Sequence, residues 1–559
     1  MVSPFSMARF GLLLALGLAS LAPAALAQPE IVPAEHPVYD FLLDQRVAGA
    51  LPEYRHEALP LGRARITAHL DSLEARGVRV SGWLRDFGQE LREPLGRVGA
   101  WVGDGAAAPW DPRAERFLGY QRDSTWRAAI RAGAALQGRA ARGATTRAGD
   151  AISPGGGALV PELVIEGNWR RRVGFYTGTS NGLQVTGDTR VLLADPVLAP
   201  LYYVQLDSSN VPGSFDRTTA SLRAVAGPLS AELANSRLRI GPSADRPLLL
   251  ADGADYLPHV RLGLDTRAVR YTFVHASLTD RSVFTRTPDG DAFLSSPERY
   301  LALHRVEAQP LRWASVGFTE MVVYGFRGPE LAYLNPLFPI KPAEHALWDR
   351  DNSLFALDAT VRPLRGVEAY GTWLVDDLDF SNIGEASVGN KWAVQGGVQA
   401  AVLAGVTAFG EYTRIEPFTY THRFSRDGVF YNAYAQNGFA LGHPLGPNAD
   451  QVLAGVRAWL PGRIRARVAG RYVRRGENPR DPDTGELVNV GGDLRNGRLP
   501  DVWPRKEFLG GDRIEGPGVQ LDLSWEPAND LALRLFADVQ AWDADRDRAF
   551  VRAEAKVRL

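Results

Sequence analysis

The stretch Ala549-Phe-Val-Arg-Ala-Glu-Ala-Lys-Val-Arg-Leu559 sets apolar and charged residues in strict alternation. One face carries Ala549, Val551, Ala553, Ala555, Val557 and Leu559, and the other carries Arg552, Glu554, Lys556 and Arg558. Successive side chains of a β-strand point to opposite faces, so this pattern fits a strand between lipid and a wet lumen. The pattern predicts that Val557 and Leu559 face lipid and that Arg558 faces the lumen.

The same alternation recurs along most of the chain. The runs at residues 162–169, 367–376, 463–472, 519–526 and 531–540 each oppose an apolar face to a polar one. Each run has about 8–12 residues, the length that crosses a bilayer when the strand is tilted. We therefore predict a mainly β fold, a large antiparallel transmembrane β-barrel over residues 116–559. A soluble sandwich with one wet face is the alternative that this alternation allows.

The length of the β region predicts the size of the barrel. It has about 445 residues, and at about 25 residues per strand and loop this gives about 16–18 strands. The run at residues 313–324 fits less well, because Glu320 shares a face with the apolar Val316, Phe318 and Val322. A carboxylate facing the middle of a bilayer is costly. Either this face looks inward or a β-bulge resets the register, and the sequence leaves both possibilities open.

The first part of the chain has a different pattern. Residues 1–27 combine Arg9, an apolar run and the small-residue site Ala25-Leu-Ala27, which is typical of a signal peptide. Residues 28–115 show helical spacing instead, in three groups: Val38, Phe41, Leu42; Ile66, Leu70, Leu73; and Leu84, Phe87, Leu91. Three short helices make a small bundle with little core of its own, so we expect it to pack on something larger. The sequence does not decide whether the bundle plugs the lumen or lies beside it.

Composition excludes several classes of function. The chain has 63 Lys and Arg against 64 Asp and Glu, for a net charge of −1, which predicts no nucleic-acid partner. It has no cysteine, so disulfides and thiolate metal sites are excluded. No run of about 18 apolar residues follows residue 27, so we expect no spanning helix. We also expect no metal and no cofactor.

Several segments, taken in order, resemble the capsule assembly protein Wzi family. They are His36-Pro-Val-Tyr-Asp-Phe-Leu42, Gly410-Glu-Tyr-Thr-Arg-Ile-Glu-Pro-Phe-Thr-Tyr-Thr-His422, and residues 304–305, 317–320, 333–337, 351–352, 376–377 and 441–450. The resemblance implies an outer-membrane barrel of about 18 strands, with residues 28–115 as a periplasmic helical bundle. It also implies a lectin-like anchor, without catalysis, that holds capsular or exo-polysaccharide at the cell surface. We expect a monomer surrounded by outer-membrane lipid.

One segment offers the chemistry that polysaccharide recognition needs. Sugar faces are apolar and sugar edges are polar, so aromatic platforms must lie beside charged or hydrogen-bonding groups. The candidate binding residues are Tyr412, Arg414, Glu416, Tyr420 and His422, together with Trp373 and Asp376. Pro417 should end the strand, so the residues after it are predicted to leave the membrane as a loop. The alternative is an aromatic interfacial belt followed by ordinary loop residues.

Two groups of charged residues each have two interpretations. A row of arginines could make a positive lumen wall suited to uronic-acid sugars, or could pair with lumen carboxylates such as Glu368 and Asp376. The row is Arg463, Arg465, Arg467 and Arg471. The carboxylates Asp376, Asp377 and Asp379 could hold a divalent ion or cleave a glycosidic bond. We interpret them as a solvated loop end, because neighbours in a strand point to opposite faces.

Two other functions remain open. A passive porin or sugar channel is the main alternative, and it requires a free lumen that helices over one mouth would block. A barrel phospholipase is the remote alternative, because His275 and Ser277 would lie on one face of a strand as base and nucleophile. The third member of such a site cannot be identified in the sequence, so we expect no catalytic residues and no enzyme.

Overall fold

The computed structural model describes most of the chain beyond residue 27. The described residues are 28–78, 80, 82–92, 118–122, 125–143, 155–201, 204–205, 213–280, 283–286, 292–295, 298–378, 385–425, 430–497, 505–528, 531–543 and 546–558. The predicted signal peptide, Asp379 and Leu559 lie outside these residues.

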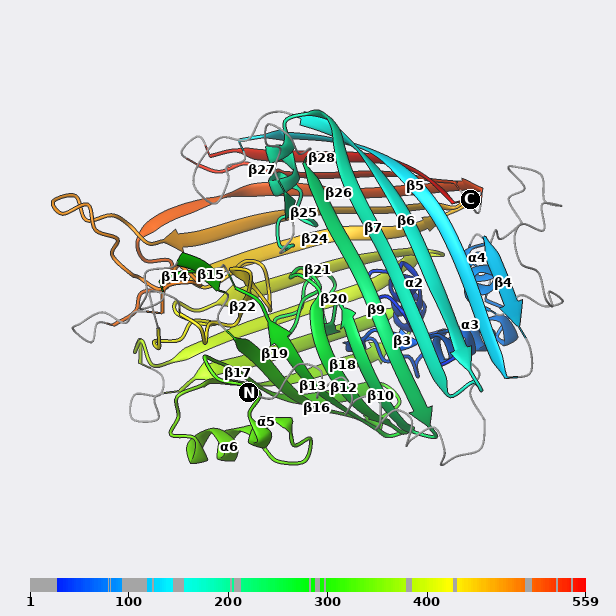
Figure 1. The fold of residues 1–559 in the computed structure, drawn as a ribbon, viewed down its shortest axis with the longest axis horizontal. Helices are drawn as coiled ribbons and strands as arrows, with labels where there is room; N and C mark the ends of the chain where they lie inside the picture. Colours follow the sequence, from blue (N-terminus) through cyan, green and yellow to red (C-terminus); the bar gives the residue numbers. More distant parts are fainter. Residues whose placement is uncertain are drawn as a thin grey trace.

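Within the described residues, eighteen antiparallel strands close into a barrel (Figure 1). The strands β28 (Arg548–Arg558) and β5 (Trp126–Arg142) pair across the seam. The other wall strands are β6 (Gly155–Trp169), β7 (Val173–Gly187), β9 (Ser214–Ala226), β10 (Leu229–Ser236), β12 (Leu257–Asp265), β13 (Val269–Leu278), β16 (Arg299–Leu311), β17 (Ala314–Gly325), β18 (Asn352–Leu364), β19 (Val367–Asp377), β20 (Lys391–Leu403), β21 (Val406–Ile415), β24 (Ala449–Leu460), β25 (Ile464–Glu477), β26 (Asp512–Ala528) and β27 (Leu531–Gln540). Two short strands, β4 (Gly119–Arg122) and β8 (Val204–Gln205), pair with β5 and β9. The predicted barrel is confirmed, and the sandwich is ruled out.

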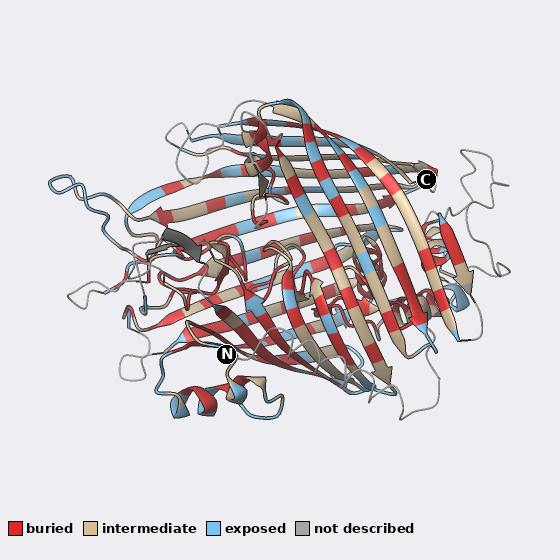
Figure 2. Cartoon of the chain, viewed as in Figure 1, coloured by how far each residue is buried: buried red, intermediate tan, exposed pale blue. Residues whose placement is uncertain are grey.

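The alternation in the sequence corresponds to the two faces of the wall. In β28, Arg552 and Arg558 face inward, where they pair with Asp195 and Glu90, while Val551 is exposed on the outside. Buried and exposed residues alternate in the same way along the other strands (Figure 2). Large apolar side chains exposed on the outer face include Leu136, Leu163, Val185, Leu233, Val316, Phe318, Leu357, Val398, Val452, Val468, Val519 and Val539. Such an apolar outer face is what a barrel in lipid requires.

The two ends of the barrel differ. At one end, the short-turn end, two or three residues join the strands at residues 170–172, 227–228, 266–268, 312–313, 365–366, 404–405 and 461–463. Longer connections lie at the other end, which we call the long-loop end. They include the β10–β12 loop (237–256), the β17–β18 loop (326–351), the β21–β24 loop (416–448) and the β25–β26 loop (478–511). Small elements in the connections at this end are η1 (Thr189–Ala194), β11 (Arg239–Ile240), β14 (Val283–Arg286), β15 (Ala292–Ser295), α5 (Leu331–Leu334), α6 (Ile340–Ala346), β22 (Ala435–Gln436) and β23 (Phe439–Ala440).

Three helices occupy the mouth at the short-turn end (Figure 1). They are α2 (Val38–Val47), α3 (Arg63–Ala75) and α4 (Trp83–Leu91), and β1 (Ile31–Val32) and β3 (Leu61–Gly62) pair beside them. The three predicted helical groups are thus confirmed. Phe41 and Trp83 pack edge-on against Trp459 of the wall, with ring centroids 5.4 and 5.1 Å away. None of the helices in the described residues is long and apolar enough to cross a membrane.

Buried charge pairs join this helical plug to the inner wall. The Asp44 carboxylate accepts hydrogen bonds from Arg457 at 2.7 Å and from the Trp459 indole at 2.8 Å. Arg46 lies between Glu57 of the plug and Glu368 of the wall, at 2.6 and 2.8 Å. These six side chains are almost fully buried. The bundle therefore plugs the lumen and does not lie beside the barrel.

The predicted row of arginines, three on β25 and Arg463 just before it, pairs with carboxylates. Arg463 lies 3.1 Å from Glu526. Arg467 lies 2.5 Å from Asp245, Arg471 lies 2.5 Å from Asp538, and Arg465 lies 3.5 Å from Asp522. Pairing was thus the right interpretation, but the partners are not the predicted ones. Glu368 binds Arg46, and Asp376 accepts the backbone N–H of Tyr420.

Glu320 is accommodated in a way that neither predicted possibility describes. It faces outward, and the pairing of β17 with β16 and β18 stays in continuous register around it. Its carboxylate accepts the backbone N–H of Ile340 at 2.8 Å. Because Ile340 begins α6, the carboxylate is covered by a helix that lies outside the barrel. Both predicted possibilities for Glu320 were therefore wrong.

Candidate functional site

Two loops from the long-loop end fold back into the lumen. In the β10–β12 loop, Leu248 and Leu249 are fully buried. In the β21–β24 loop, the Tyr420 hydroxyl donates to the Leu248 carbonyl at 2.7 Å, and the Tyr434 hydroxyl donates to the Leu249 carbonyl. The two tyrosine rings stack with centroids 5.5 Å apart. These loops form a hydrophobic core with wall side chains such as Val274 inside the barrel.

The β10–β12 loop also reaches the helical plug. Its residues Arg239 and Ile240 pair with Leu59 and Ala58 of β2 (Ala58–Leu59), which precedes α3 in the plug. A loop from the long-loop end therefore contacts the helical plug from the short-turn end inside the lumen.

A cavity of about 540 Å³ opens among the loops at the long-loop end. We call it the loop cavity. Its polar lining consists of Arg475, Glu477, Asn478, Asp493, Arg495 and Arg548, and Phe439 and Leu487 add apolar surface. Gly438, Gly446 and Gly492 also line it, and a Cβ at Gly492 would collide with the Gly476 carbonyl oxygen, so this glycine lets two segments of the chain pack closely.

Arginine dominates the charge of the loop cavity. The Arg475 guanidinium donates to the Leu445 carbonyl at 3.0 Å, and Arg495 lies 3.5 Å from Asp493. Glu477 is engaged by Arg546, 2.7 Å away. Among the described residues, no carboxylate pairs with Arg475 or with Arg548. Guanidinium groups bind carboxylates through two parallel hydrogen bonds, so this cavity suits an acidic ligand.

Tyr420 and Asp376, two of the predicted site residues, meet beneath the loop cavity. The Tyr420 backbone N–H donates to the Asp376 carboxylate at 2.5 Å. Gly442 lines the cavity, and a Cβ at this position would lie 2.6 Å from the Tyr420 hydroxyl oxygen. Tyr420 is fully buried, so it supports the floor of the cavity.

Tyr412, Arg414 and Glu416 cluster on the outer side of the wall, where β21 reaches the long-loop end. The Arg414 guanidinium lies 3.8 Å from the centroid of the Phe508 ring and 2.7 Å from the Glu416 carboxylate. The Tyr412 hydroxyl donates to Asp450 at 3.1 Å. We call these residues the outer rim. Tyr412 and Arg414 face away from the lumen, where an interfacial belt of aromatic residues is expected in a barrel, whereas Glu416 is buried and also pairs with Lys506 at 2.8 Å.

The remaining two predicted site residues lie apart from both groups. Trp373 faces outward and is 44% exposed, so it does not share a face with Asp376. The His422 ring packs on Phe424, with ring centroids 5.1 Å apart. The seven residues therefore do not form one site, and whether each of them binds polysaccharide stays a prediction.

The sequence analysis did not single out Arg475, Arg495 or Arg548. For Arg475 a signal was present, because it continues the inward spacing of Arg467 and Arg471 along β25. Arg548 likewise precedes Arg552 at inward spacing on β28, whereas Arg495 lies in a loop where no alternation could have indicated it.

The carboxylates at the end of β19 do not act together. Asp376 is buried, while the Asp377 side chain is 58% exposed and lies 3.7 Å from Lys391. The third carboxylate of that group, Asp379, lies outside the described residues. In the part of the chain that the structure describes, no group of three or more acidic or histidine side chains could hold a metal ion.

His275 and Ser277 share the outward face of β13, as predicted, but their surroundings differ. The His275 ring is buried, stacks on Tyr300 with centroids 5.5 Å apart, and shares a hydrogen bond with the Tyr324 hydroxyl at 2.7 Å. Ser277 is exposed on the outer wall. The imidazole is thus held by two tyrosines, an arrangement that does not favour a base acting on Ser277.

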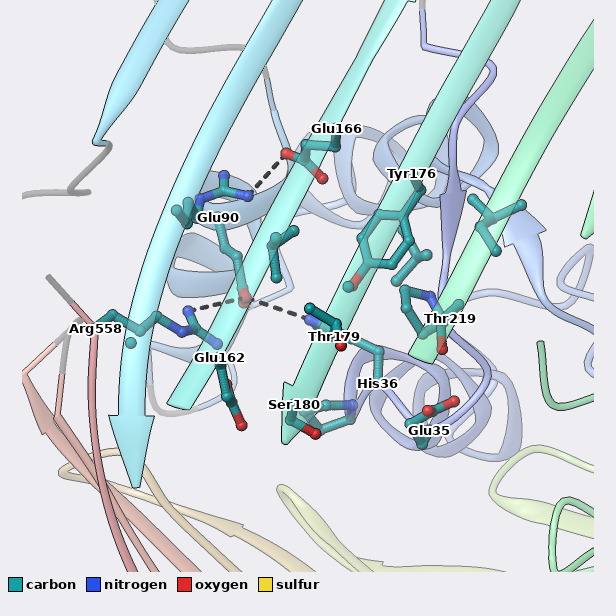
Figure 3. Close-up of a pocket in the computed structure, with 18 of the residues that line it drawn as sticks. Glu35, His36, Glu90, Glu162, Glu166, Tyr176, Thr179, Ser180, Thr219 and Arg558 are labelled. Carbon is teal, nitrogen blue, oxygen red and sulfur yellow. Dashed lines mark hydrogen bonds and ion pairs between the residues drawn. The ribbon is translucent and has the colours of Figure 1, made fainter. Parts of the chain in front are cut away.

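A second cavity, of about 290 Å³, lies between the plug and the wall (Figure 3). Glu90 of α4 lies 3.4 Å from both His36 and Arg558, so it joins the plug to the last strand. Glu166 pairs with Arg131 across the same cavity at 2.8 Å. These charged groups are engaged with each other, so the cavity is part of the plug interface.

An 18-strand closed barrel with an apolar outer face and a plugged lumen defines an outer-membrane β-barrel protein. The family model for the capsule assembly protein Wzi matches residues 223–551. The chain belongs to this family, as its sequence resemblance implied. Among curated protein sequences, none matches the chain significantly.

The fold agrees with that of one solved member. Wzi from Escherichia coli, described as a carbohydrate-binding outer-membrane β-barrel involved in group 1 capsule assembly, has a TM-score of 0.55 and 12% identity, with coverage of 94% of this chain and 98% of that one. OccAB4 from Acinetobacter baumannii and OpdK from Pseudomonas aeruginosa each give a TM-score of 0.43 and 10% identity, covering 77% of this chain and 98% of theirs. A TM-score below 0.5 does not establish a shared fold.

Proposed function

We propose that this protein binds an acidic capsular or extracellular polysaccharide at the cell surface and holds it there without cleaving it. Membership of the capsule assembly family supports this role. So does the description of Escherichia coli Wzi, which has a similar fold, as a carbohydrate-binding barrel.

The proposal includes an orientation in the membrane. Short turns face the periplasm and long loops face the outside in outer-membrane barrels. On this rule the helical plug, within the predicted bundle at residues 28–115, is periplasmic, and the loop cavity opens on the extracellular surface. The cavity then lies where a surface polymer can reach it.

The observation that carries the proposal is the arginine-lined loop cavity. Its volume of about 540 Å³ falls within the range of ligand pockets, about 300–1,000 Å³. Arg475, Arg495 and Arg548 supply charged donors for uronic-acid carboxylates, and Phe439 supplies an aromatic face for a sugar ring.

The closed lumen favours retention of a polymer over its passage. The helical plug enters from one end, two loops enter from the other, and β2 pairs with β11 between them. A diffusion channel needs a free lumen, so this arrangement disfavours the porin alternative.

The outer rim is a second proposed contact for the polymer. Tyr412 and Arg414 present an aromatic ring and a guanidinium group near the extracellular mouth, and the buried Glu416 holds Arg414 in place. In this proposal Tyr420 and Asp376 act as positioning residues, because they support the cavity floor from below. His422 and Trp373 are expected to contribute less, since they lie apart from both surfaces.

The test replaces two cavity arginines, Arg495→Gln and Arg548→Gln, in one variant. Each charge-assisted contact contributes about 1.5 kcal/mol, so binding of one site should weaken about a hundredfold. Calorimetry with purified protein and short acidic oligosaccharides measures this directly, and avoids the multivalent attachment that could hide the loss on cells. The same oligosaccharides with reduced carboxyl groups should bind the wild type weakly.

The matched control is Arg480→Gln, an exposed arginine of the β25–β26 loop that lies outside the cavity lining. This variant should bind like the wild type. If the double variant binds normally while its barrel is intact, the loop cavity is not the site. If cells lacking the whole protein retain their polysaccharide, the retention function itself is wrong.

A further inference from the structure

The β17–β18 loop takes an unusual path outside the barrel. After β17 ends at Gly325, the chain does not extend away from the long-loop end. It turns back along the outer wall, where α5 and α6 lie against β16 and β17 (Figure 1). We call residues 326–351 the outer strap.

Several contacts fix the outer strap to the wall. At its base, Arg327 pairs with Asp351 at 2.5 Å, and the Tyr333 hydroxyl donates to the same carboxylate at 2.9 Å. The Tyr324 hydroxyl of β17 accepts the backbone N–H of Glu330 at 3.0 Å. The buried cluster between strap and wall consists of Ala302, Val322, Tyr324, Tyr333, Ile340 and Ala343. The strap is therefore packed on the wall, and it buries outward-facing residues that would otherwise meet lipid.

The strap reaches far down the membrane-facing surface. Glu320, which accepts the Ile340 N–H, lies five residues below Gly325 in β17. Five strand residues cover about 16 Å, or about 12 Å of depth at the tilt usual in such barrels. Deeper still, the Tyr271 hydroxyl donates to the Pro336 carbonyl, and Tyr271 is the third residue of β13 from its short-turn end. The middle of the strap therefore lies well below the end of β17, beside the outward faces of β13 and β17.

Four large apolar side chains of the strap are exposed, alongside the partly exposed charged side chains of Lys341, His345 and Asp349. Leu331 is 79% exposed, Leu337 is 86% exposed and Trp348 is 91% exposed. Phe338 is exposed beside them, at 39%. These side chains continue the apolar outer face of the neighbouring strands, where Phe318 and Leu357 are exposed in the same way. Exposed apolar side chains of this size are costly in water, and several of them in one segment point to an interaction surface.

The charges of the strap are paired with one another except that of Arg350, which is exposed and has no ion-pair partner among the described residues. Lys341 lies 2.6 Å from Glu344, and His345 lies 3.5 Å from Asp349. An apolar surface beside paired charges and a tryptophan is typical of segments that lie in the boundary between acyl chains and headgroups.

We propose that the outer strap lies in the outer leaflet of the membrane, with Leu331, Leu337 and Phe338 among acyl chains and Trp348 at headgroup level. The occupant of its apolar face is lipid, because the face is continuous with the lipid-facing wall and lies at the same depth. The strap thickens the wall at β16–β18 within the leaflet. It thereby fixes the height at which the extracellular loops stand above the membrane. This role does not depend on polysaccharide binding.

The chain has no cysteine, so single-cysteine variants can carry one fluorescent label each. Leu337→Cys and Trp348→Cys probe the strap in the full-length protein in liposomes. Leu357→Cys on the wall is the lipid-exposed reference, and Asp483→Cys in the β25–β26 loop is the water-exposed reference. Migration of unboiled samples on gels verifies that each barrel is folded.

With lipids brominated at mid-chain, the label at residue 337 should lose most of its emission, as the label at residue 357 does. The label at residue 483 should keep its emission and respond only to aqueous iodide. The label at residue 348 should be quenched more by headgroup-linked quenchers than by mid-chain bromine.

Three results would overturn the proposal. The first is a label at residue 337 that responds to iodide and not to bromine, because the strap then stands in water. The second is protection that grows with protein density in the liposome, because a second copy of the chain then covers the strap. The third is protection that requires added polysaccharide.

Discussion

At the scale of a single residue, the buried side chain of His443 leads to a prediction of how polysaccharide binding depends on pH. This side chain of the β21–β24 loop is 2% exposed, and its neighbours Gly442 and Pro444 line the loop cavity. Its Nδ1 accepts the backbone N–H of Leu445 at 3.2 Å, whereas its Nε2 has no hydrogen-bond partner among the described residues. Burial lowers the pKa of His443 from 6.5 to about 4, against the opposing effect of Asp245 and with a smaller lowering by Arg246.

The sign of the effect follows from linkage. The folded loop holds a neutral imidazole, so its stability is fully present above pH 6.5 and is lost as pH falls through about 4. Oligosaccharide binding should therefore weaken progressively between about pH 6.5 and about pH 4.5, where uronic carboxylates are still mostly ionised. In His443→Gln this loss should be much smaller. His345→Gln, at an exposed position in the outer strap, should behave like the wild type, and an unchanged profile in His443→Gln would exclude His443 as the sensitive group.

The face on which a strand residue lies could be predicted from the sequence, but its partner could not. Strict alternation places Arg552 and Arg558 in the lumen, and the structure agrees. Beyond Pro417 the alternation carries no information. Phe418 and Tyr420 adopt φ values of 67° and 71°, a region that bulky side chains rarely occupy. Tyr420 therefore turns into the lumen toward Asp376, a contact that depends on the folded loop and not on local pattern.

At the scale of elements, the docking of α2 in the lumen depends on its buried ion pairs. Asp44→Ala would leave Arg457 buried without its carboxylate partner, a change that costs about 3–5 kcal/mol. The plug should then open more often while the barrel stays closed. Hydrogen exchange of the amides of α2–α4 measures this opening, with the strand amides as an internal reference.

The matched control removes an exposed ion pair from the same plug. Glu53 and Arg76 lie 2.7 Å apart with side chains 44% and 43% exposed, so Glu53→Ala should cost about 0–1 kcal/mol. Equal exchange in the two variants would mean that the Asp44–Arg457 pair does not hold the plug.

Helices and strands with a clear periodicity of apolar residues could be predicted from the sequence, and those without such a periodicity could not. The helical spacing of Ile66, Leu70 and Leu73 predicts α3, whose buried residues include these three. By contrast, α6 has only seven residues, with Pro339 before it and Pro342 inside it, so it has no recognisable helical pattern. For this reason the sequence offered no correct explanation for a carboxylate at position 320 on the apolar face. Its partner is the backbone of a segment that cannot be recognised locally.

At the scale of the whole molecule, the lumen is filled from both ends. The helical plug and the two inward loops come from distant parts of the chain and meet at the β2–β11 pairing. The sequence predicted a bundle at one mouth but left its position open, since helical spacing does not report which surface a bundle packs against. The inward loops were not foreseen, because their burial comes from a core shared with the wall.

This double closure predicts a specific pattern of ion conductance in planar bilayers. The wild type should show no steady current, and a variant lacking residues 28–92 should show little, because the β10–β12 and β21–β24 loops still fill the other half of the lumen. Replacing both loops by short turns in that variant should open a steady channel, since barrels of about 16–18 strands enclose an aqueous pore when empty. Removal of residues 326–351, which lie outside the wall, is the control and should leave the wild-type behaviour unchanged. A steady current through the full-length protein would contradict the closed lumen and would favour the channel function over retention of polysaccharide.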